Sequence, residues 1–419
     1  MGPLTMRDRL RSGLGDPLLF WLVLVLSLIG VAMVYSAGQL DVPDPAVEGL
    51  WVKQLIFLAV SLVAMFFVMR VETRWFEWAA VPLYVVGVLA LAATLVIGTG
   101  KGTAAGVRSW IDLGPISVQP SQFAVVATIL MLARVMGGRG QSPHSLFSLW
   151  RPLLVAAVPM GLVMLQPDLG TAMVSGAVLM ATLYWAGTPV GVLFLLLSPV
   201  LGLFLAFKPW LFSIYMPALV VFLYMYRIYL WEGVLVVAAN LAAGTIAVPL
   251  WNSLEPYQQA RLLVFLDPGL DPRGAGWHVT QSRVAIGSGG LFGKGFLMGT
   301  QKRLAFLPEQ HTDFIFSVIG EEKGFIGTAV VLLLFGLVLW RLVRISERVP
   351  DPFAGIVAFG IFGAWFAHVV VNVGMTVGVM PVTGIPLPFI SYGGSFLLAS
   401  FIALGIAQSI AKEHARVLP

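Results

Sequence analysis

A lone acidic side chain stands where a polar stretch of the chain ends and a long apolar stretch begins. Asp313 closes the polar run 308–312 and is followed by Phe314 and Ile315. Apolar neighbours favour proton uptake by a carboxylate, whereas the start of a helix stabilises its anion. Two roles are therefore open for Asp313: a general base at a membrane surface, or a helix N-cap, for which Thr312 would serve equally well.

Further acidic residues lie at similar boundaries. Glu321 and Glu322 follow Asp313 by about two helical turns. They point about 100° apart on a helix, so at most one of them should face a given pocket. Glu321 is therefore a candidate for a substrate-binding cavity or a solvated charge. Asp168 lies between two apolar runs, where it is either the N-cap of the following helix or a catalytic group.

Basic side chains near these stretches are candidates for neutralising a diphosphate. Arginine grips phosphate oxygens in bidentate fashion, and lysine supplies a point charge. For those in segment 99–118 the alternative is ordinary snorkelling at a membrane interface. The candidates are Lys101, Arg108, Arg261, Lys294 and Lys302.

The glycine-rich run 287–295 resembles a phosphate loop only superficially. It lacks the lysine–hydroxyl ending of such loops and does not sit in a strand–helix unit. Its glycines either let the backbone pack closely or form a nest for an anion. The five histidines form no spaced ligand set, so no metal site is predicted. The sequence requires no cofactor, although a magnesium or manganese ion bridging a diphosphate and a carboxylate is compatible with it.

The composition excludes a soluble protein. Of the 419 residues, 58% are hydrophobic and only 11% charged, which is too little charge to cover a soluble surface. Repeated apolar runs of about 20 residues indicate membrane-spanning helices and are too long and uniform for barrel strands. We predict an all-α polytopic membrane protein with about 12 transmembrane helices in one integral membrane domain, 1–419. The expected spans are 17–37, 51–69, 75–98, 119–136, 152–166, 170–187, 189–207, 210–226, 229–251, 314–342, 353–380 and 388–411.

The distribution of lysine and arginine predicts the orientation. Arg7, Arg9 and Arg11 precede the first span, and the first opposite loop carries only acidic charges. By the positive-inside rule both termini are cytoplasmic. The outer side then holds segment 99–118, the turn at Asp168 and a large extracytoplasmic loop, 252–312. A loop of that length usually indicates function or disorder, and its glycines and aromatic residues argue against disorder.

Five separated stretches together resemble one known family. The order of these stretches and their sides of the membrane match the shape, elongation, division and sporulation (SEDS) family of membrane glycosyltransferases, and its elongation branch more than its division branch. The stretches are 108–115 with 119–121, 166–172, 257–295 in part, the run around Asp313, and 381–395.

The resemblance implies a peptidoglycan glycosyltransferase that polymerises lipid-linked disaccharide (lipid II) during cell elongation. It implies an inverting reaction with Asp313 as the base, and Ser391 and Tyr392 either bind sugar or satisfy backbone groups. The expected substrate is an undecaprenyl-diphosphate-linked disaccharide-peptide, and the expected partner a class B penicillin-binding protein. The expected location is the bacterial cytoplasmic (inner) membrane, with the active site on the extracytoplasmic face. Membrane lipid is a further expected partner, and nucleic acid is not expected to be one.

Two departures from the family pattern stand out. Gln122 and Val125 occupy positions where the family usually carries a glutamate and a lysine. Segment 188–251 holds three spans where one is expected, which predicts an inserted transmembrane hairpin. Two other functions remain open: a flippase for the lipid-linked precursor, and a non-catalytic scaffold for a penicillin-binding protein. A flippase should show paired halves or polar residues at mid-span, and we find no internal repeat.

Overall fold

The computed structural model describes most of the chain. It covers residues 14–42, 44, 47–100, 108–112, 114, 117–138, 145–227, 229–254, 256–266, 275–304, 306–307 and 309–417, without the side chains of 256, 257, 261, 266, 275 and 415–417.

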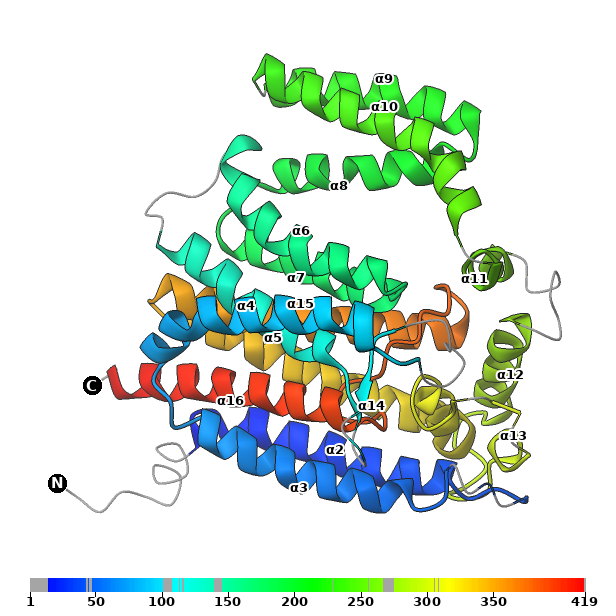
Figure 1. Ribbon diagram of the computed structural model, residues 1–419. Helices are drawn as coiled ribbons and strands as arrows, with labels where there is room; N and C mark the ends of the chain where they lie inside the picture. Colours follow the sequence, from blue (N-terminus) through cyan, green and yellow to red (C-terminus); the bar gives the residue numbers. More distant parts are fainter. Residues whose placement is uncertain are drawn as a thin grey trace.

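Helices make up nearly all of the described structure (Figure 1). Twelve of them are apolar and lie roughly side by side across the view of Figure 1, and three lie in the large loop between α10 and α14. The twelve are α2 (Pro17–Ala37), α3 (Leu50–Val68), α4 (Thr73–Ile97), α5 (Pro120–Gly137), α6 (Trp150–Leu165), α7 (Leu169–Trp185), α8 (Val190–Leu205), α9 (Pro209–Tyr226), α10 (Leu230–Ser253), α14 (Ile315–Arg348), α15 (Pro352–Val377) and α16 (Gly394–Val417). The loop helices are α11 (Pro256–Leu266), α12 (Ala275–Ser288) and α13 (Thr300–Arg303), and the remaining elements are η1 (Phe147–Leu149) and the antiparallel pair β1 (Ile111–Asp112) and β2 (Ser117–Val118).

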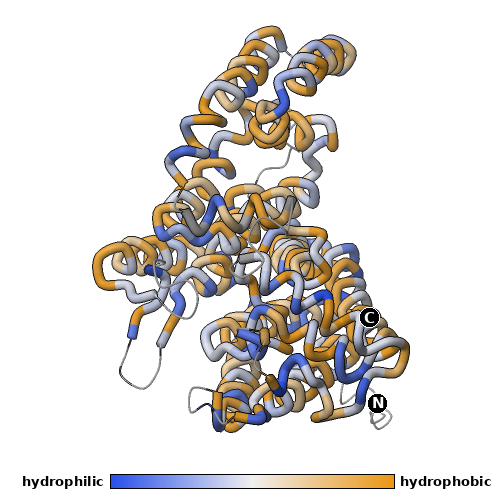
Figure 2. The backbone as a smooth tube through the Cα atoms, turned by 90° about the vertical axis from the view of Figure 1, so that its right-hand side faces the viewer, coloured by the Kyte–Doolittle hydropathy of each residue, from blue (hydrophilic) through white to orange (hydrophobic). Residues whose placement is uncertain are grey.

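Ten of the described helices, taking η1 and α6 together, are long and apolar enough to cross a membrane, and α7 and α8 are shorter, at 17 and 16 residues. The prediction of an all-α polytopic membrane protein is confirmed. Figure 2 shows hydrophobic residues along the helices and hydrophilic residues gathered mostly at their ends and in the loops. Local sequence explains several helix starts: Asp16, Asp168 and Asp351 accept backbone N–H bonds as N-caps, as expected for short acidic side chains.

One expected span begins later than its sequence predicts. The last span was expected from 388, but α16 begins at Gly394, and residues 381–393 form irregular backbone. Three prolines in that segment remove backbone donors and disfavour helix, and Gly384 has a φ of +74°. Irregular backbone at the edge of a membrane is tolerated where surrounding protein satisfies its polar groups.

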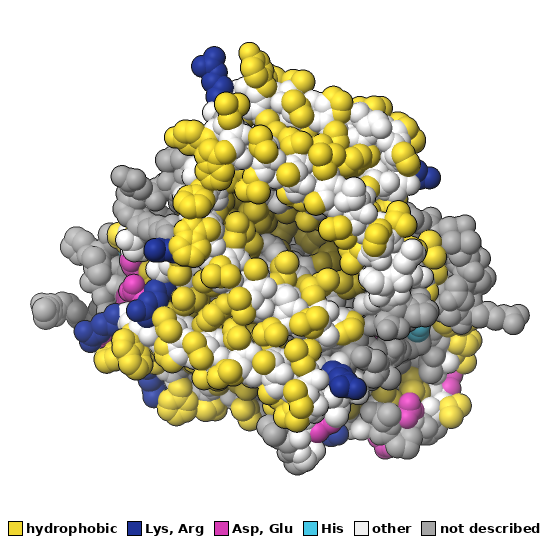
Figure 3. Space-filling model, turned by 45° about the horizontal axis from the view of Figure 1, so that its top comes forward, with side chains coloured by type: hydrophobic (Ala, Val, Ile, Leu, Met, Phe, Trp, Pro, Cys, Tyr) yellow, Lys and Arg dark blue, Asp and Glu magenta, His cyan; other side chains and the backbone are white. Residues whose placement is uncertain are grey.

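The helices fall into two unequal groups. In the larger group α15 is central, and it packs against α5, α7, α14 and α16. Of the residues in its 18-residue apolar stretch, 83% are buried. In the smaller one α8, α9 and α10 pack on one another and stand apart at the top of Figure 1, joined to the bundle where α8 meets α7. In the corresponding 18-residue stretches, only 11% of the residues of α9 and 17% of those of α10 are buried. Figure 3 shows a face that is largely hydrophobic with basic side chains at its edges, as expected for helices in contact with lipid.

Candidate active site

Asp313 lies in the turn that leads into α14. It is half-buried, and its N–H donates to the Glu309 carbonyl over 3.1 Å. Its side chain faces the irregular segment 381–393, where a Cβ added at Gly384 would lie 3.4 Å from Asp313 Oδ2. The carboxylate therefore lies between the start of a spanning helix and Gly384, which has no side chain.

The backbone just before Asp313 is held by Ser391 and Tyr392. The Tyr392 N–H donates to the His311 carbonyl over 2.9 Å, and the Ser391 hydroxyl donates to the Thr312 carbonyl over 2.6 Å. The same hydroxyl accepts the Leu387 N–H over 2.8 Å. The Ser391 side chain therefore satisfies backbone groups on two segments, whereas Tyr392 is held through its backbone N–H.

A third bond fixes the carbonyl of Asp313 itself. Asn372 of α15 donates from Nδ2 to the Asp313 carbonyl over 2.9 Å and to the Ile385 carbonyl over 2.7 Å. Three consecutive carbonyls, 311 to 313, are thus each bound by a different donor. The sequence analysis missed Asn372, although a polar residue inside a strongly apolar span is a signal of function or helix contact.

The side chains of His311 and Tyr392, beside this turn, are uncharged near neutral pH. His311 and Tyr392 meet edge to face with ring centroids 5.6 Å apart. Burial lowers the pKa of His311 below its usual value of 6.5, against a smaller opposing effect of Glu309. Burial also raises the pKa of Tyr392 above its usual 10.0. Neither ring therefore carries a charge at neutral pH.

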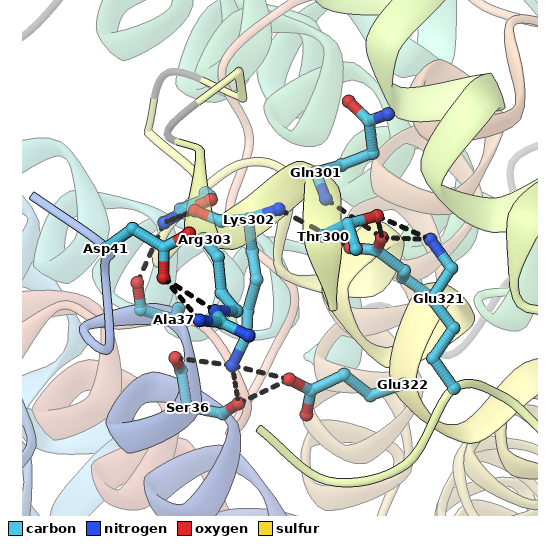
Figure 4. A network of polar contacts seen from close by, with 11 residues as sticks. Ser36, Ala37, Asp41, Thr300, Gln301, Lys302, Arg303, Glu321 and Glu322 are labelled. Atoms are coloured by element: carbon cyan, nitrogen blue, oxygen red, sulfur yellow. Dashed lines mark hydrogen bonds and ion pairs between the residues drawn. The ribbon is translucent and has the colours of Figure 1, made fainter. Parts of the chain in front are cut away.

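Glu321 binds the loop between α12 and α14 (Figure 4). Its Oε1 lies 2.7 Å from Lys294 Nζ and accepts the Gln301 N–H over 2.9 Å and the Thr300 hydroxyl over 3.1 Å. Glu321 is fully buried, whereas the side chain of Lys294 is 27% exposed. Lys294 is therefore within reach of a ligand, but its charge is already matched by Glu321.

Glu322 binds a different lysine, on the side of α2 (Figure 4). Its Oε1 lies 2.5 Å from Lys302 Nζ and accepts the Ser36 hydroxyl over 2.6 Å. Lys302 also donates to the Ser36 carbonyl over 2.9 Å. Lys302 and Glu322 are both fully buried, and burial is the largest influence, lowering the pKa of Lys302, against its bond with Glu322.

The burial of Lys302 corrects its sequence-based assignment. A lysine with no exposed surface and a 2.5 Å partner does not reach a diphosphate, so it fastens α13 to α2 and α14 instead. The sequence favoured the diphosphate role because Lys302 lies in a polar, basic loop. The pairing with Glu322 joins residues 20 positions apart, which local sequence does not reveal.

The glycine-rich run packs closely against a break in α14. Gly324 has φ 65° and ψ −163°, which interrupts the helix. Across the break, residues 290–295 exchange four backbone hydrogen bonds with residues 321–326, from 2.8 to 3.1 Å long. A Cβ at Gly289 would lie 2.0 Å from the Gly320 carbonyl oxygen, and one at Gly293 2.1 Å from that of Glu322. Of the two roles open from sequence, these distances support close packing.

The remaining candidate residues are Asp168, Arg108, Lys101 and Arg261. The start of α7 lies against the irregular segment 381–393, because a Cβ at Gly170 would lie 2.9 Å from the Thr383 carbonyl oxygen. Asp168 is the N-cap of α7, accepting the Thr171 N–H over 3.0 Å and its hydroxyl over 2.8 Å. Arg108 is exposed in the segment before β1. Lys101 lies outside the described residues, and the side chain of Arg261 is not among those described.

The two positions that depart from the family pattern line one pocket. Gln122 and Val125 of α5 face a small pocket between α5, α15 and α16, together with Trp365 and His368. Gln122 Nε2 donates to Gln119 Oε1 over 3.1 Å. Within the described part of the chain, no group of three His, Asp or Glu side chains is arranged to hold a metal ion.

Fold and site together define a polytopic helical membrane protein with a carboxylate fixed at the entrance of a spanning helix. The family model described as a cell cycle protein, covering FtsW, RodA and SpoVE, matches residues 17–228 and 211–416. These matches span most of the chain, so it belongs to this family, which is the one that the five sequence stretches indicated.

Curated relatives agree over nearly the full length. The chain is 34% identical to the peptidoglycan glycosyltransferase RodA of Treponema pallidum (strain Nichols), over 94% of this chain and 97% of that protein. It is also 34% identical to the peptidoglycan glycosyltransferase MrdB of Escherichia coli (strain K12), over 96% and 95%. These relatives agree with the elongation branch.

Two solved structures share the fold. One is described as structural coordination of polymerization and crosslinking by a peptidoglycan synthase complex, with 29% identity and a TM-score of 0.70 over 95% of this chain and 98% of that one. The other is the rod shape determining protein RodA of Thermus thermophilus, with 27% identity and a TM-score of 0.62 over 95% and 97%.

Proposed function

We propose that this protein is a peptidoglycan glycosyltransferase that polymerises lipid II, with Asp313 as its general base. The observation that carries the proposal is the anchoring of three consecutive carbonyls, which fixes Asp313 at the entrance of α14. Family membership and relatives named for this activity support the reaction class. A base needs such fixed geometry more than it needs any particular starting pKa.

The reaction needs only one carboxylate. The hydroxyl oxygen of the acceptor sugar attacks the anomeric carbon of the donor, whose bond to the diphosphate oxygen breaks. Asp313 takes the hydroxyl proton, and undecaprenyl diphosphate leaves with the bonding electron pair. An α-linked donor then gives a β-linked product, so the reaction inverts configuration. Arg108, Lys101, Arg261 and Lys294 are the side chains proposed to neutralise the diphosphate, and a divalent cation bound through the diphosphate would serve the same purpose.

The location follows from charge and from family. We place the protein in the bacterial cytoplasmic (inner) membrane with both termini cytoplasmic, because basic residues flank the N-terminal span. Asp313 then lies on the extracytoplasmic face, below loop 252–312. A class B penicillin-binding protein is the proposed partner, since the glycan made here needs crosslinking and a structural relative belongs to a complex that does both.

The segment 188–251 is proposed to hold an inserted hairpin. The family model matches the chain in two parts, 17–228 and 211–416, which overlap in the region of α9. α9 is the least buried of the ten long apolar helices described, and α10 follows it together with α4. An insertion on the lipid-facing edge would leave the position of Asp313 unchanged.

The test is polymerisation from defined components. Purified protein, with a transpeptidase-inactive penicillin-binding protein, is incubated with lipid II, and the product is resolved by length. Polymer is the expected product. Absence of polymer, with lipid II moving across vesicle membranes in a parallel assay, would replace the proposal by a flippase. Absence of both activities would favour the scaffold, for which the uncharged Gln122 and Val125 are the supporting observation.

A further inference from the structure

Two buried polar side chains of α15 point at the irregular segment 381–393. His368 Nδ1 lies 3.0 Å from the Pro386 carbonyl, and Asn372 Nδ2 lies 2.7 Å from the Ile385 carbonyl. They are four residues apart and therefore share one face of the helix. This face of α15 thus makes hydrogen bonds to two consecutive carbonyls of the segment.

Asn372 differs from His368 because it also binds the turn of Asp313. Its amide nitrogen donates to the Asp313 and Ile385 carbonyls at once, at 2.9 and 2.7 Å. Carbonyl oxygens only accept hydrogen bonds, so the NH₂ group of Asn372 must face both. The side chain is fully buried, so a rotation would leave both carbonyls without this donor.

These two hydrogen bonds from Asn372 set the distance between the Asp313 turn and the irregular segment 381–393. Asp313 and Ile385 belong to two different segments, and Gly384, next to Ile385, faces the carboxylate with 3.4 Å between Asp313 Oδ2 and the place of a Cβ. One donor holding both carbonyls fixes how far the carboxylate lies from that turn. Ser391 and Tyr392 hold the two preceding carbonyls, those of Thr312 and His311, whereas Asn372 holds the carbonyl of Asp313 itself.

We propose that Asn372 is a positioning residue, which sets the place of the Asp313 carboxylate relative to the acceptor hydroxyl. The proposal rests on Asp313 being the base. It goes further in assigning the rate of the chemical step to a side chain of α15 that touches no substrate. A misplacement of the base by about 1 Å costs on the order of 100-fold in rate.

Asn240 of α10 provides a matched control. It too is a fully buried asparagine in an apolar helix, and its Nδ2 donates to Ser198 Oγ and to the Val236 carbonyl, each over 2.9 Å. It lies in the α8–α10 group, away from Asp313. Replacing either asparagine by leucine removes the buried donors and keeps the branching and the number of side-chain heavy atoms, and both variants carry the same increase in volume.

The experiment compares Asn372→Leu and Asn240→Leu in the full protein with its transpeptidase-inactive partner. Steady-state polymerisation of lipid II gives kcat and KM, and thermal unfolding in detergent reports folding. For Asn372→Leu we expect kcat to fall about 10- to 100-fold with KM within about threefold. For Asn240→Leu we expect both constants to stay within about threefold of those of the parent protein.

Two outcomes overturn the proposal: a folded Asn372→Leu protein with the parent kcat, or equal losses of kcat in both variants. If Asn372→Leu does not fold, Asn372→Ser, which keeps one donor, is measured against the same limits. Asp313→Asn in the same assay separates the two proposals. If Asp313→Asn polymerises at the parent rate, the base assignment fails. If Asp313→Asn is inactive and Asn372→Leu is normal, only the positioning role fails.

Discussion

The surroundings of Asp313 and the α8–α10 group use the same kind of residue for different ends. Asn240 ties helices together, because its Oδ1 accepts the Tyr215 hydroxyl over 2.9 Å and its Nδ2 binds Ser198. Asn372 ties a helix to irregular backbone on two segments. A buried amide between helices gives cohesion, whereas one that holds irregular backbone gives a carboxylate a fixed place. The comparison predicts that substitutions near Asp313 lower the rate of polymerisation. Substitutions in the α8–α10 group should lower only the stability of the fold.

The largest effect on stability is expected from the buried ion pair. Lys302→Met leaves the Glu322 carboxylate buried without its cation, which costs about 3–5 kcal/mol of unfolding free energy. Thermal or denaturant unfolding in detergent measures it. Arg303→Met is the control, because the Arg303–Asp41 pair is exposed and its loss costs less than about 1 kcal/mol. Equal destabilisation by the two variants would contradict the structural role of Lys302.

The glycine-rich run supplies the second test. Gly289→Ala would place a Cβ 2.0 Å from the Gly320 carbonyl oxygen, so the loop must move from the break in α14. We expect a loss of about 1–3 kcal/mol and reduced polymerisation. Gly287→Ala is the control in the same run, since its Cβ would meet nothing within 4 Å. If both variants behave as the parent protein, the run is not a packing element.

A smaller effect sharpens the other side of the comparison. Asn240→Leu removes interhelical bonds in the α8–α10 group and should cost about 1 kcal/mol, in line with polar contacts in other helical membrane proteins. Polymerisation per folded molecule should be unchanged. Loss of activity without loss of folded protein would show that this group takes part in the reaction.

The smallest effect concerns pH. Burial lowers the pKa of His311 in the folded protein below the usual 6.5, so the unfolded chain binds the proton more readily. Stability then rises with pH across this range and falls as the pH drops below about 6.5. His311→Gln should flatten that part of the stability–pH curve, measured by thermal unfolding between about pH 5 and 7. A parent curve that gains stability on acidification in this window would contradict the direction of the shift.

Much of the fold could be predicted because it depends on local sequence. Long apolar runs gave the spanning helices, and Asp168 became the N-cap that its place after a proline allowed. Three prolines explain why α16 starts late, a boundary that hydropathy alone does not detect.

The contacts that define the site could not be predicted, because they join distant residues. Lys302 meets Ser36 across 266 positions and Ser391 meets Thr312 across 79. Asn372 appeared in sequence as one polar residue within an apolar helix. Its role depends on two carbonyls whose positions follow only from the folded backbone.

The most direct test of the account is the rate of lipid II polymerisation by Asp313→Asn. The amide keeps the size of the side chain but cannot act as a base for the hydroxyl proton of the acceptor sugar. We expect a loss of about 10²- to 10⁴-fold in kcat, with an unfolding temperature equal to that of the parent protein. Polymerisation at the parent rate by the folded variant would contradict the assignment of Asp313 as the general base.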